Sequence, residues 1–486
     1  MFVRTKRRAA GALLMVLIGT RAAAGQQPAT AGPTPETSMA RDGSGTSWLP
    51  DSSPMYMWHG AAGGWGLSAH ENAFVQYLHD SGARGVDQAG SINWVMGMAE
   101  RRSGQRHLAV RGMFSAEPWT VRGCGYPNLL QSGERCAGAV IHDRQHPHDL
   151  FMEIAAEYDA PLAGGWRWQI YGGPAGEPAL GPTAFPHRPS AMPNPLAPIS
   201  HHWLDSTHVS FGVVTAGVYG ARWKIESSAF NGREPDERRT NIDLGLLDSL
   251  SGRVWFLPTP RLALQASAGH LAQAEAGLDG APRRDVNRVT ASATYQRLDA
   301  RRVWASTVAW GRNAESGEAT HALLAETAVT LDDRDTWYGR FEVVGKPPGD
   351  LAVPETLDVV TVAKLEAGYT RYVAAGRFRP GIGIEASAGL VPGSLRAFYG
   401  GRVNAGVGVY LTLRPRAMPQ ASGGSRMVMV QTALDPAKLT CDAPAPPGGR
   451  AHAEYRGTTY YFCSARDRDA FLQDPAMSLS MMPPRQ

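Results

Sequence analysis

The middle of the chain alternates apolar and polar residues with a period of two, and this alternation predicts β-strands. The clearest examples are the segments 166–171, 222–229, 262–268, 289–296 and 407–414. Turn signals separate such segments, among them Pro258-Thr259-Pro260 and Pro347-Pro348-Gly349-Asp350. Each segment therefore offers one face to apolar surroundings and the other to polar ones.

About sixteen candidate strands lie between Leu67 and Leu413, many of them roughly eight to twelve residues long, which suits a tilted strand that crosses a bilayer. Lipid cannot satisfy exposed backbone N–H and C=O groups, so a strand protein in a membrane must close on itself. We predict an all-β fold, an antiparallel transmembrane β-barrel of about 14–16 strands over residues 56–415. A soluble extracytoplasmic sandwich or barrel shares the alternation and is the alternative.

The N-terminus has the features of a secretory signal. Arg4 and the basic run 6–8 precede an apolar run at 9–18, and small residues follow at 22–24. The apolar run is about ten residues, roughly half of a membrane-spanning helix. We predict a cleaved signal at 1–24 and a disordered lead-in rich in Pro, Ser, Thr and Gly at 25–55. Export and a barrel together predict the outer membrane of a Gram-negative bacterium, with its lipid as a partner.

The net charge of +4 is small for 486 residues, and the arginines are scattered through the chain. A nucleic-acid partner is therefore not expected.

A second irregular region carries eight prolines between Gly172 and Pro198, so it cannot be a membrane strand. We predict a long Pro/His-rich loop at about 172–206, outside the barrel or folded into its lumen, and loops of this size commonly carry function. A further linker is expected at 416–434.

Histidines gather on both sides of the start of this loop. Seven of the fourteen histidines lie between residues 142 and 208. Imidazole is the commonest ligand for copper, zinc and nickel. The candidate ligands are His142, His146, His148, His201, His202 and His208. The alternative is a solvated hydrogen-bond network that ties the loop to the barrel wall. The segment Met55-Tyr56-Met57-Trp58-His59 adds thioethers that suit Cu(I).

Several stretches in the same region resemble a group of uncharacterised outer-membrane barrel proteins from heavy-metal (copper) resistance loci. These stretches are Asp143–Met152, Gly176–Pro182, His201–His208 and Phe230–Asp236. The resemblance extends over roughly Trp58 to Arg414 and implies the fold more than an activity.

Near the C-terminus, Tyr455-Arg456-Gly457-Thr458-Thr459-Tyr460-Tyr461-Phe462-Cys463-Ser464 is followed by Phe471 and Asp474-Pro475. This pattern resembles the YHS/TRASH-type metal-binding modules that occur beside heavy-metal transport proteins. It implies a small α+β metal-binding-like module at 435–486.

The resemblance suggests a ligand set of Cys441, Cys463, Asp467 and His452. Asp467 stands where such modules carry another cysteine. Two thiolates and a carboxylate suit Zn(II) better than Cu(I). The alternative is that Cys441 and Cys463 form a disulfide, because a segment of about fifty residues usually needs a staple.

The other two cysteines, Cys124 and Cys136, enclose a loop with Gly125, Pro127 and Gly133. In an oxidising compartment they are expected to form a disulfide that stabilises by roughly 3 kcal/mol.

No enzyme signature is present, and the pair Glu234 and Asp236 is interpreted as a polar turn after a strand. The sequence thus predicts a barrel that binds or passes copper or a related heavy-metal ion, with Cu or Zn as the candidate ion. Periplasmic metal-efflux components are candidate partners. The alternatives are a non-specific porin-like channel with a structural His-rich loop and an outer-membrane hydrolase.

Overall fold

The structure is a computed structural model that describes residues 39–417, apart from 276–281, 300, 316 and 355. It also describes residues 432–434, 439, 449–463, 468 and 471–472. The predicted signal at 1–24 and most of the predicted linker at 416–434 lie outside these residues.

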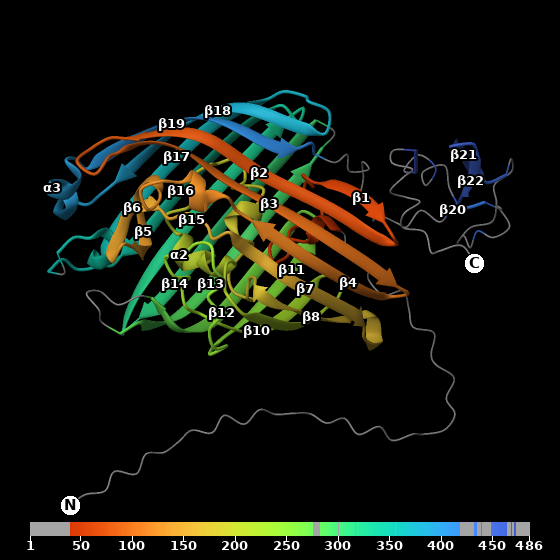
Figure 1. The fold of residues 1–486 in the computed structure, drawn as a ribbon, viewed down its shortest axis with the longest axis horizontal. Coiled ribbons are helices and arrows are strands. Elements are labelled where there is room, and N and C mark those ends of the chain that lie inside the picture. The colour runs from red at the N-terminus through yellow and green to blue at the C-terminus, as the bar shows by residue number, and fades with distance from the viewer. Residues whose placement is uncertain are drawn as a thin grey trace, which may run out of the picture.

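Sixteen antiparallel strands close into a barrel, which confirms the predicted all-β fold (Figure 1). They are β2 (Trp65–Asp80), β3 (Asp87–Ser103), β4 (Arg106–Phe114), β7 (Phe151–Pro161), β8 (Arg167–Ala175), β9 (Val213–Tyr219), β10 (Trp223–Phe230), β11 (Ser249–Thr259), β12 (Leu262–Glu275), β13 (Arg284–Leu298), β14 (Arg302–Glu315), β15 (Glu318–Leu331), β16 (Asp335–Lys346), β17 (Val360–Tyr372), β18 (Phe378–Leu390) and β19 (Val403–Pro415). The ring closes where β19 pairs with β2, with Leu413 opposite Ala73. A short strand, β1 (Trp58–Ala62), pairs with the beginning of β2.

The barrel wall is apolar outside and polar inside. On β19, the outward-facing Val407, Val409 and Leu411 are each more than half exposed. On β16, Arg340 and Glu342 face the lumen and are buried. A closed ring satisfies every backbone group within the wall, and an apolar outer face is the surface that lipid solvates. The alternation seen in the sequence is therefore that of a membrane-spanning barrel.

The two ends of the barrel differ. At one end the connections are short, and exposed aromatic side chains stand beside them on the outer face. These aromatics are Trp166, Trp223, Trp304, Trp337 and Phe378. At this end the chain enters the barrel at the start of β2 and leaves it at the end of β19. The other end carries the longer connections, including 115–150, 176–212 and 231–248. In outer-membrane barrels the short turns face the periplasm and the long loops face outward, with aromatic girdles at the interfaces.

The helices of the described residues are short. They are η1 (Met39–Arg41), α1 (Glu117–Thr120), η2 (Ala163–Gly165), η3 (Phe185–His187), α2 (His201–Leu204), η4 (Ser206–His208), η6 (Pro348–Leu351), η7 (Gly393–Leu395) and α3 (Arg396–Tyr399). Among the described residues, none of these helices has the length and apolar content to span a bilayer.

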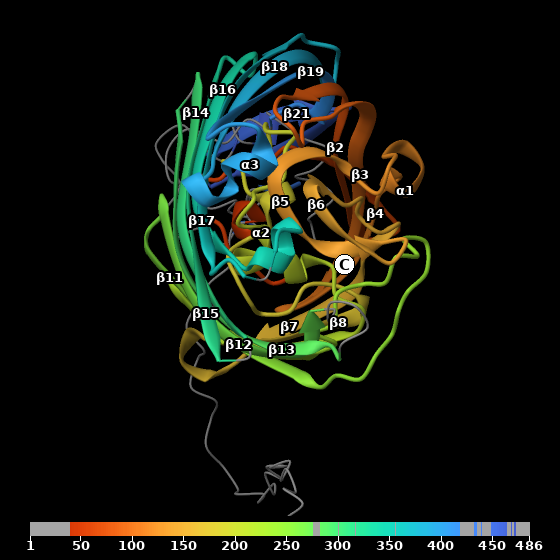
Figure 2. The same ribbon diagram turned by 90° about the vertical axis from the view of Figure 1, so that its left-hand side faces the viewer.

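The long connection between β8 and β9 folds into the lumen, together with the hairpin of β5 (Tyr126–Cys136) and β6 (Ala139–Gln145). Figure 2 shows α2 and this hairpin inside the ring of strands. Arg188 of the connection is fully buried and contacts Glu326 of β15 at 2.5 Å and Asp205 at 3.0 Å. The connection runs from 176 to 212 rather than from 172 to 206, because β8 continues through Pro174 to Ala175. We call residues 176–212 the lumen loop.

The lumen loop packs on the wall and on the hairpin through the largest apolar cluster of the described residues. It includes Leu129, Leu130, Ile199, Trp203, Val344, Leu351, Leu395 and Tyr399. The predicted disulfide between Cys124 and Cys136 is present, with their Cα atoms 5.8 Å apart. The disulfide thus ties Cys124, which precedes β5, to Cys136 at the end of β5.

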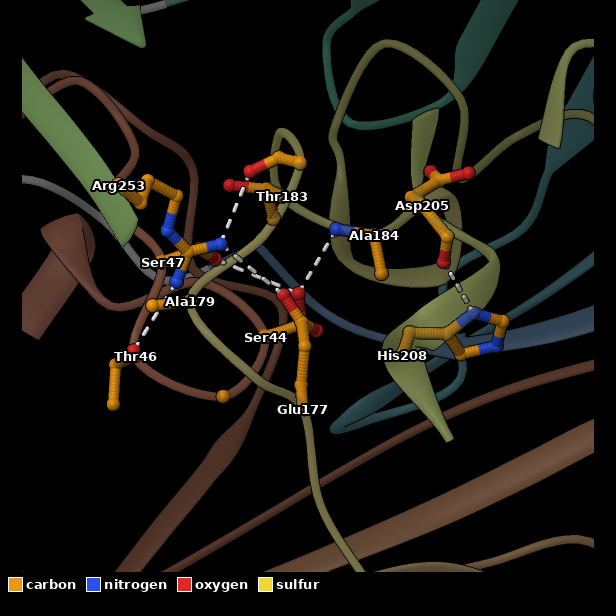
Figure 3. A network of polar contacts seen from close by, with 12 residues as sticks. Ser44, Thr46, Ser47, Glu177, Ala179, Thr183, Ala184, Asp205, His208 and Arg253 are labelled. Atoms are coloured by element: carbon orange, nitrogen blue, oxygen red, sulfur yellow. Dashed lines mark hydrogen bonds and ion pairs between the residues drawn. The ribbon is translucent and has the colours of Figure 1, made fainter. Parts of the chain in front are cut away.

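The predicted disorder of 25–55 is wrong for residues 39–55, which are ordered and largely buried in the lumen. Figure 3 shows how this segment is held: Arg253 of β11 donates to the Thr46 hydroxyl at 3.1 Å, and the backbone N–H of Ala184 donates to the Ser44 hydroxyl at 2.9 Å. A segment with few apolar residues buries too little apolar surface to order itself on its own. Here the charged inner wall supplies the partners for a polar segment instead.

Part of the predicted C-terminal module is described. The strands β20 (Thr432–Ala433), β21 (Ala451–Tyr455) and β22 (Thr458–Phe462) form an antiparallel sheet. Ala453, Tyr460, Phe462 and Phe471 are buried against one another.

Candidate metal site at the lumen mouth

Two segments that are distant in the sequence bring five of the predicted histidines to one pocket. His146 and His148 follow β6, in the connection that leads to β7, and His201, His202 and His208 lie on α2 and η4 of the lumen loop. All five line a single pocket with the carboxyl groups of Asp149 and Glu234. The fold thus brings histidines of the two sequence clusters together in one place.

The Nδ1 atoms of three of these imidazoles, those of His148, His201 and His208, are held by oxygen atoms. His148 Nδ1 lies 3.0 Å from both carboxylate oxygens of the fully buried Glu117. His201 Nδ1 lies 2.8 Å from Asp205 Oδ1, and His208 Nδ1 lies 2.9 Å from the Asp205 carbonyl oxygen (Figure 3). An Nδ1–H that donates to oxygen leaves the lone pair on Nε2. Oxygen partners of this kind orient the histidine ligands of metal sites.

On three of the five imidazoles the Nε2 nitrogen has no such partner. Nε2 of His148, of His202 and of His208 is buried without a hydrogen-bond partner among the described residues. A buried polar atom without a partner costs free energy, typically about 1–3 kcal/mol. Three such atoms in one pocket need an explanation, and a cation that accepts imidazole lone pairs would supply one.

Glu234 and Glu275 join His202 in the tightest group of candidate ligands. One ligand atom from each of the three lies within 4.8 Å of the other two, which among the described residues singles out this group. His202 Nδ1 is 3.1 Å from Glu234 Oε1. His202 comes from α2, Glu234 from the connection after β10, and Glu275 from the end of β12. All three lie at the long-loop end of the barrel, which we call the mouth of the lumen, and we call these three residues the mouth triad.

Burial keeps most of these imidazoles neutral. It lowers the pKa of His201 to about 4 and that of His208 to about 3, and it also lowers the pKa of His146 and of His202. For His148, burial alone would lower the pKa, but the charge and hydrogen bond of Glu117 outweigh it and raise the pKa. A neutral imidazole is the form that binds a metal.

The carboxyl groups respond in the opposite direction. Burial raises the pKa of Asp149 to about 8 and that of Glu234 to about 7, because the charged form loses its hydration. Asp205 differs: burial would raise its pKa, but the hydrogen bond to His201 and the charge of Arg188 lower it. Asp205 is therefore an anion that braces the loop, whereas the carboxyl groups of Asp149 and Glu234 would both be favoured in their charged form by a nearby cation.

The other predicted ligands lie elsewhere. His142 is not part of the pocket; its Nδ1 is 2.7 Å from Asp143 Oδ2 and 3.3 Å from an Arg84 nitrogen. In the C-terminal sheet, His452 faces Tyr461 across the β21–β22 pair. Cys463 is disulfide-bonded, which is one of the two alternatives that the sequence left open. Cys441 and Asp467 lie outside the described residues.

Sequence reasoning missed three carboxylates. Glu234 was interpreted as a turn residue, and neither Glu117 nor Glu275 follows a recognisable motif. A signal existed only for Glu234, which belongs to the stretch Phe230–Asp236 that resembles the barrels of resistance loci. Glu275 reaches the site because the lumen loop folds inward and brings α2 to the end of β12.

No protein-family model matches this chain, and no curated protein matches it significantly. Several solved porins have a similar overall shape. The anion-selective porin from Comamonas acidovorans shares 9% identity with a TM-score of 0.44, covering 73% of this chain and 100% of the porin. OmpF of Salmonella typhi shares 10% identity at the same TM-score and coverage. The outer membrane channel DcaP of Acinetobacter baumannii shares 7%, with a TM-score of 0.42, 73% of this chain and 99% of DcaP. These similarities are too low to carry an argument. The barrel fold is established by the strand pairing of this chain itself.

Proposed function

We propose that this protein is an outer-membrane barrel of a Gram-negative bacterium that binds a heavy-metal ion, copper or zinc, at the mouth of its lumen and lets it pass. One observation carries the proposal: imidazoles anchored through Nδ1 turn unpartnered Nε2 atoms into the same pocket, beside the mouth triad. Structural histidines in a hydrogen-bond network would use both ring nitrogens.

The chemistry of the triad indicates the kind of ion. One imidazole and two carboxylates are the nitrogen and oxygen ligands that Zn(II) and Cu(II) accept. Sulfur is absent from the described residues that line this pocket, so a soft ion such as Cu(I) is disfavoured there. Because Glu234 has a raised pKa, a divalent ion would displace its proton and gain a charged ligand.

A second candidate is a porin-like channel without metal preference. The charged inner wall, with Arg253, Arg340 and Lys364 facing the lumen, favours it. However, the lumen loop and the segment 39–55 occupy much of the lumen, and both are largely buried there. Passage of large solutes would require these segments to move, whereas an ion needs only a chain of ligands.

The resemblance of the C-terminal module to metal-binding modules extends the proposal to the periplasmic side. Both ends of the barrel chain lie at the short-turn end, the periplasmic end in such barrels. A module attached there would receive the ion only with Cys463 reduced, because the sulfur of Cys463 is otherwise disulfide-bonded. It could instead contact periplasmic efflux components. If a Cys441→Ser/Cys463→Ser variant retains the full metal content of the wild type, these cysteines serve only as a disulfide.

Elemental analysis of refolded protein, after incubation with Zn(II) or Cu(II) and removal of free ion, tests the proposal. We expect bound metal in the wild type and a loss in the variant His202→Ala/Glu234→Gln. His142→Ala is the matched control, because it removes an imidazole that lies outside the pocket. Wild-type protein that retains neither ion would overturn the proposal and leave the porin-like channel.

A further inference from the structure

A second cluster of candidate ligands lies on the inner face of three neighbouring strands. Strand register places His70 of β2 opposite Met96 of β3, and Met96 opposite Met113 of β4. The three side chains therefore form one row across the wall. In Trp94-Val95-Met96-Gly97-Met98 the period-two alternation turns Met96 to the inner face, and Met113 of β4 is buried on the same face.

The lumen loop adds a second imidazole to this row. His187 of η3 lies with its Nε2 3.3 Å from Met113 Sδ, and His70 Nε2 lies 3.0 Å from Met96 Sδ. The two imidazole rings are themselves 5.3 Å apart between centroids. Two nitrogens and two sulfurs from four elements thus converge on one small region. We call His70, Met96, Met113 and His187 the thioether site.

The surroundings of the thioether site exclude water. Met96 and Met113 are 3% and 4% exposed, within an apolar cluster that also holds Trp94, Met152 and Phe211. Trp94 packs against both imidazoles, with ring centroids 5.0 Å from His70 and 4.9 Å from His187. The nearby Arg111 is paired with Glu157 at 2.6 Å, which offsets its charge.

Packing alone explains this arrangement poorly. A thioether is a weak hydrogen-bond acceptor, so an imidazole nitrogen that faces a methionine sulfur gives up a better partner. Burying a polar nitrogen without a good partner is unfavourable. The same four atoms are, however, neutral and soft ligands, and soft thioether ligands select Cu(I). A monovalent ion would also bring a single charge into the lumen rather than two.

We infer that the thioether site binds a soft monovalent cation, Cu(I), through Met96, Met113, His70 and His187. The site differs from the mouth triad in position and in ligand chemistry, and it stands whether or not a divalent ion binds at the triad. If both sites bind metal, the lumen holds a site for Zn(II) or Cu(II) at its mouth and a separate site for Cu(I).

The test measures Cu(I) binding to refolded protein in competition with a chromogenic Cu(I) chelator, with Ag(I) as a probe that cannot change its redox state. We expect the wild type to bind one Cu(I). The variant Met96→Leu/Met113→Leu should bind Cu(I) with an affinity at least tenfold lower than that of the wild type. Leucine keeps the apolar volume of methionine, so the barrel should remain folded. His187→Gln is a second variant and should also weaken binding.

Met152→Leu is the matched control, because it removes a thioether from the same apolar cluster but not from the row. X-ray absorption of the Cu(I) form should show a sulfur shell in the wild type and in this control. Wild-type protein without Cu(I), or Met96→Leu/Met113→Leu protein with unchanged affinity, would refute the inference. The variant His202→Ala/Glu234→Gln separates the two sites: it should lose Zn(II) but keep Cu(I).

Discussion

Glu234 illustrates how position gives an ordinary residue a chemical role. In the sequence it belongs to a polar turn, yet in the fold it reaches His202 at 3.1 Å and forms the mouth triad with Glu275. Burial raises its pKa to about 7, so it is only partly ionised at neutral pH. A divalent cation would favour the ionised form. Metal binding at this residue would therefore be coupled to proton release.

This coupling predicts a pH dependence. As the pH falls from 8 to 6, Glu234 and Asp149 take up protons, and wild-type affinity for Zn(II) should decrease, by up to about tenfold per pH unit for each proton displaced. Isothermal titration calorimetry at several pH values measures the slope. Glu234→Gln should bind Zn(II) more weakly and with a flatter slope. An equally steep slope in this variant would show that Glu234 does not release the proton.

At the scale of elements, the lumen loop depends on charges that the wall supplies. Arg188 is fully buried between Glu326 of β15 and Asp205 of the loop, and Asp205 in turn holds His201. Removing one partner of a buried ion pair typically costs about 3–5 kcal/mol, because the remaining charge stays buried. Arg188 is thus one of the anchors of the loop that positions three of the pocket histidines, beside the apolar cluster described above.

Arg188→Ala should release the lumen loop from the wall and raise the single-channel conductance of the barrel in planar bilayers. Arg301→Ala is the control, because Arg301 also pairs with an aspartate, Asp332, but on an exposed turn. Exposed pairs contribute roughly 0–1 kcal/mol. Equal conductance of Arg188→Ala and wild type would mean that the loop is held by its apolar contacts.

The N-terminal segment offers a second test at this scale. Gly45 has φ of +51°, and a Cβ there would lie 2.7 Å from the Glu177 Cβ, so Gly45→Ala should displace residues 39–55 from the lumen. Gly63→Ala is the control, with φ of +58° and open space around it. Both substitutions strain the backbone. Limited proteolysis should cleave the segment faster in Gly45→Ala than in Gly63→Ala, and equal rates would contradict the packing described.

At the scale of the whole molecule, the sequence predicted what depends on local periodicity. Alternating segments such as 262–268 and 407–414 are strands, and Cys124 and Cys136 are bonded. The histidines at 146–148 and 201–208 meet because both groups lie in connections at the long-loop end of the barrel. What could not be predicted depends on how the lumen loop folds inward, because only this fold brings His202 of α2 to Glu275 at the end of β12. The order of residues 39–55 likewise arises from charges on distant strands.

Anomalous diffraction from a crystal of the full barrel soaked in Zn(II), recorded at the zinc absorption edge, tests metal binding at the lumen mouth most directly. We expect a peak between His202, Glu234 and Glu275, which is absent from Glu234→Gln crystals grown in the same way. Anomalous density only at surface positions, with none in the pocket, would contradict a metal-binding mouth and return the histidines to a bracing role.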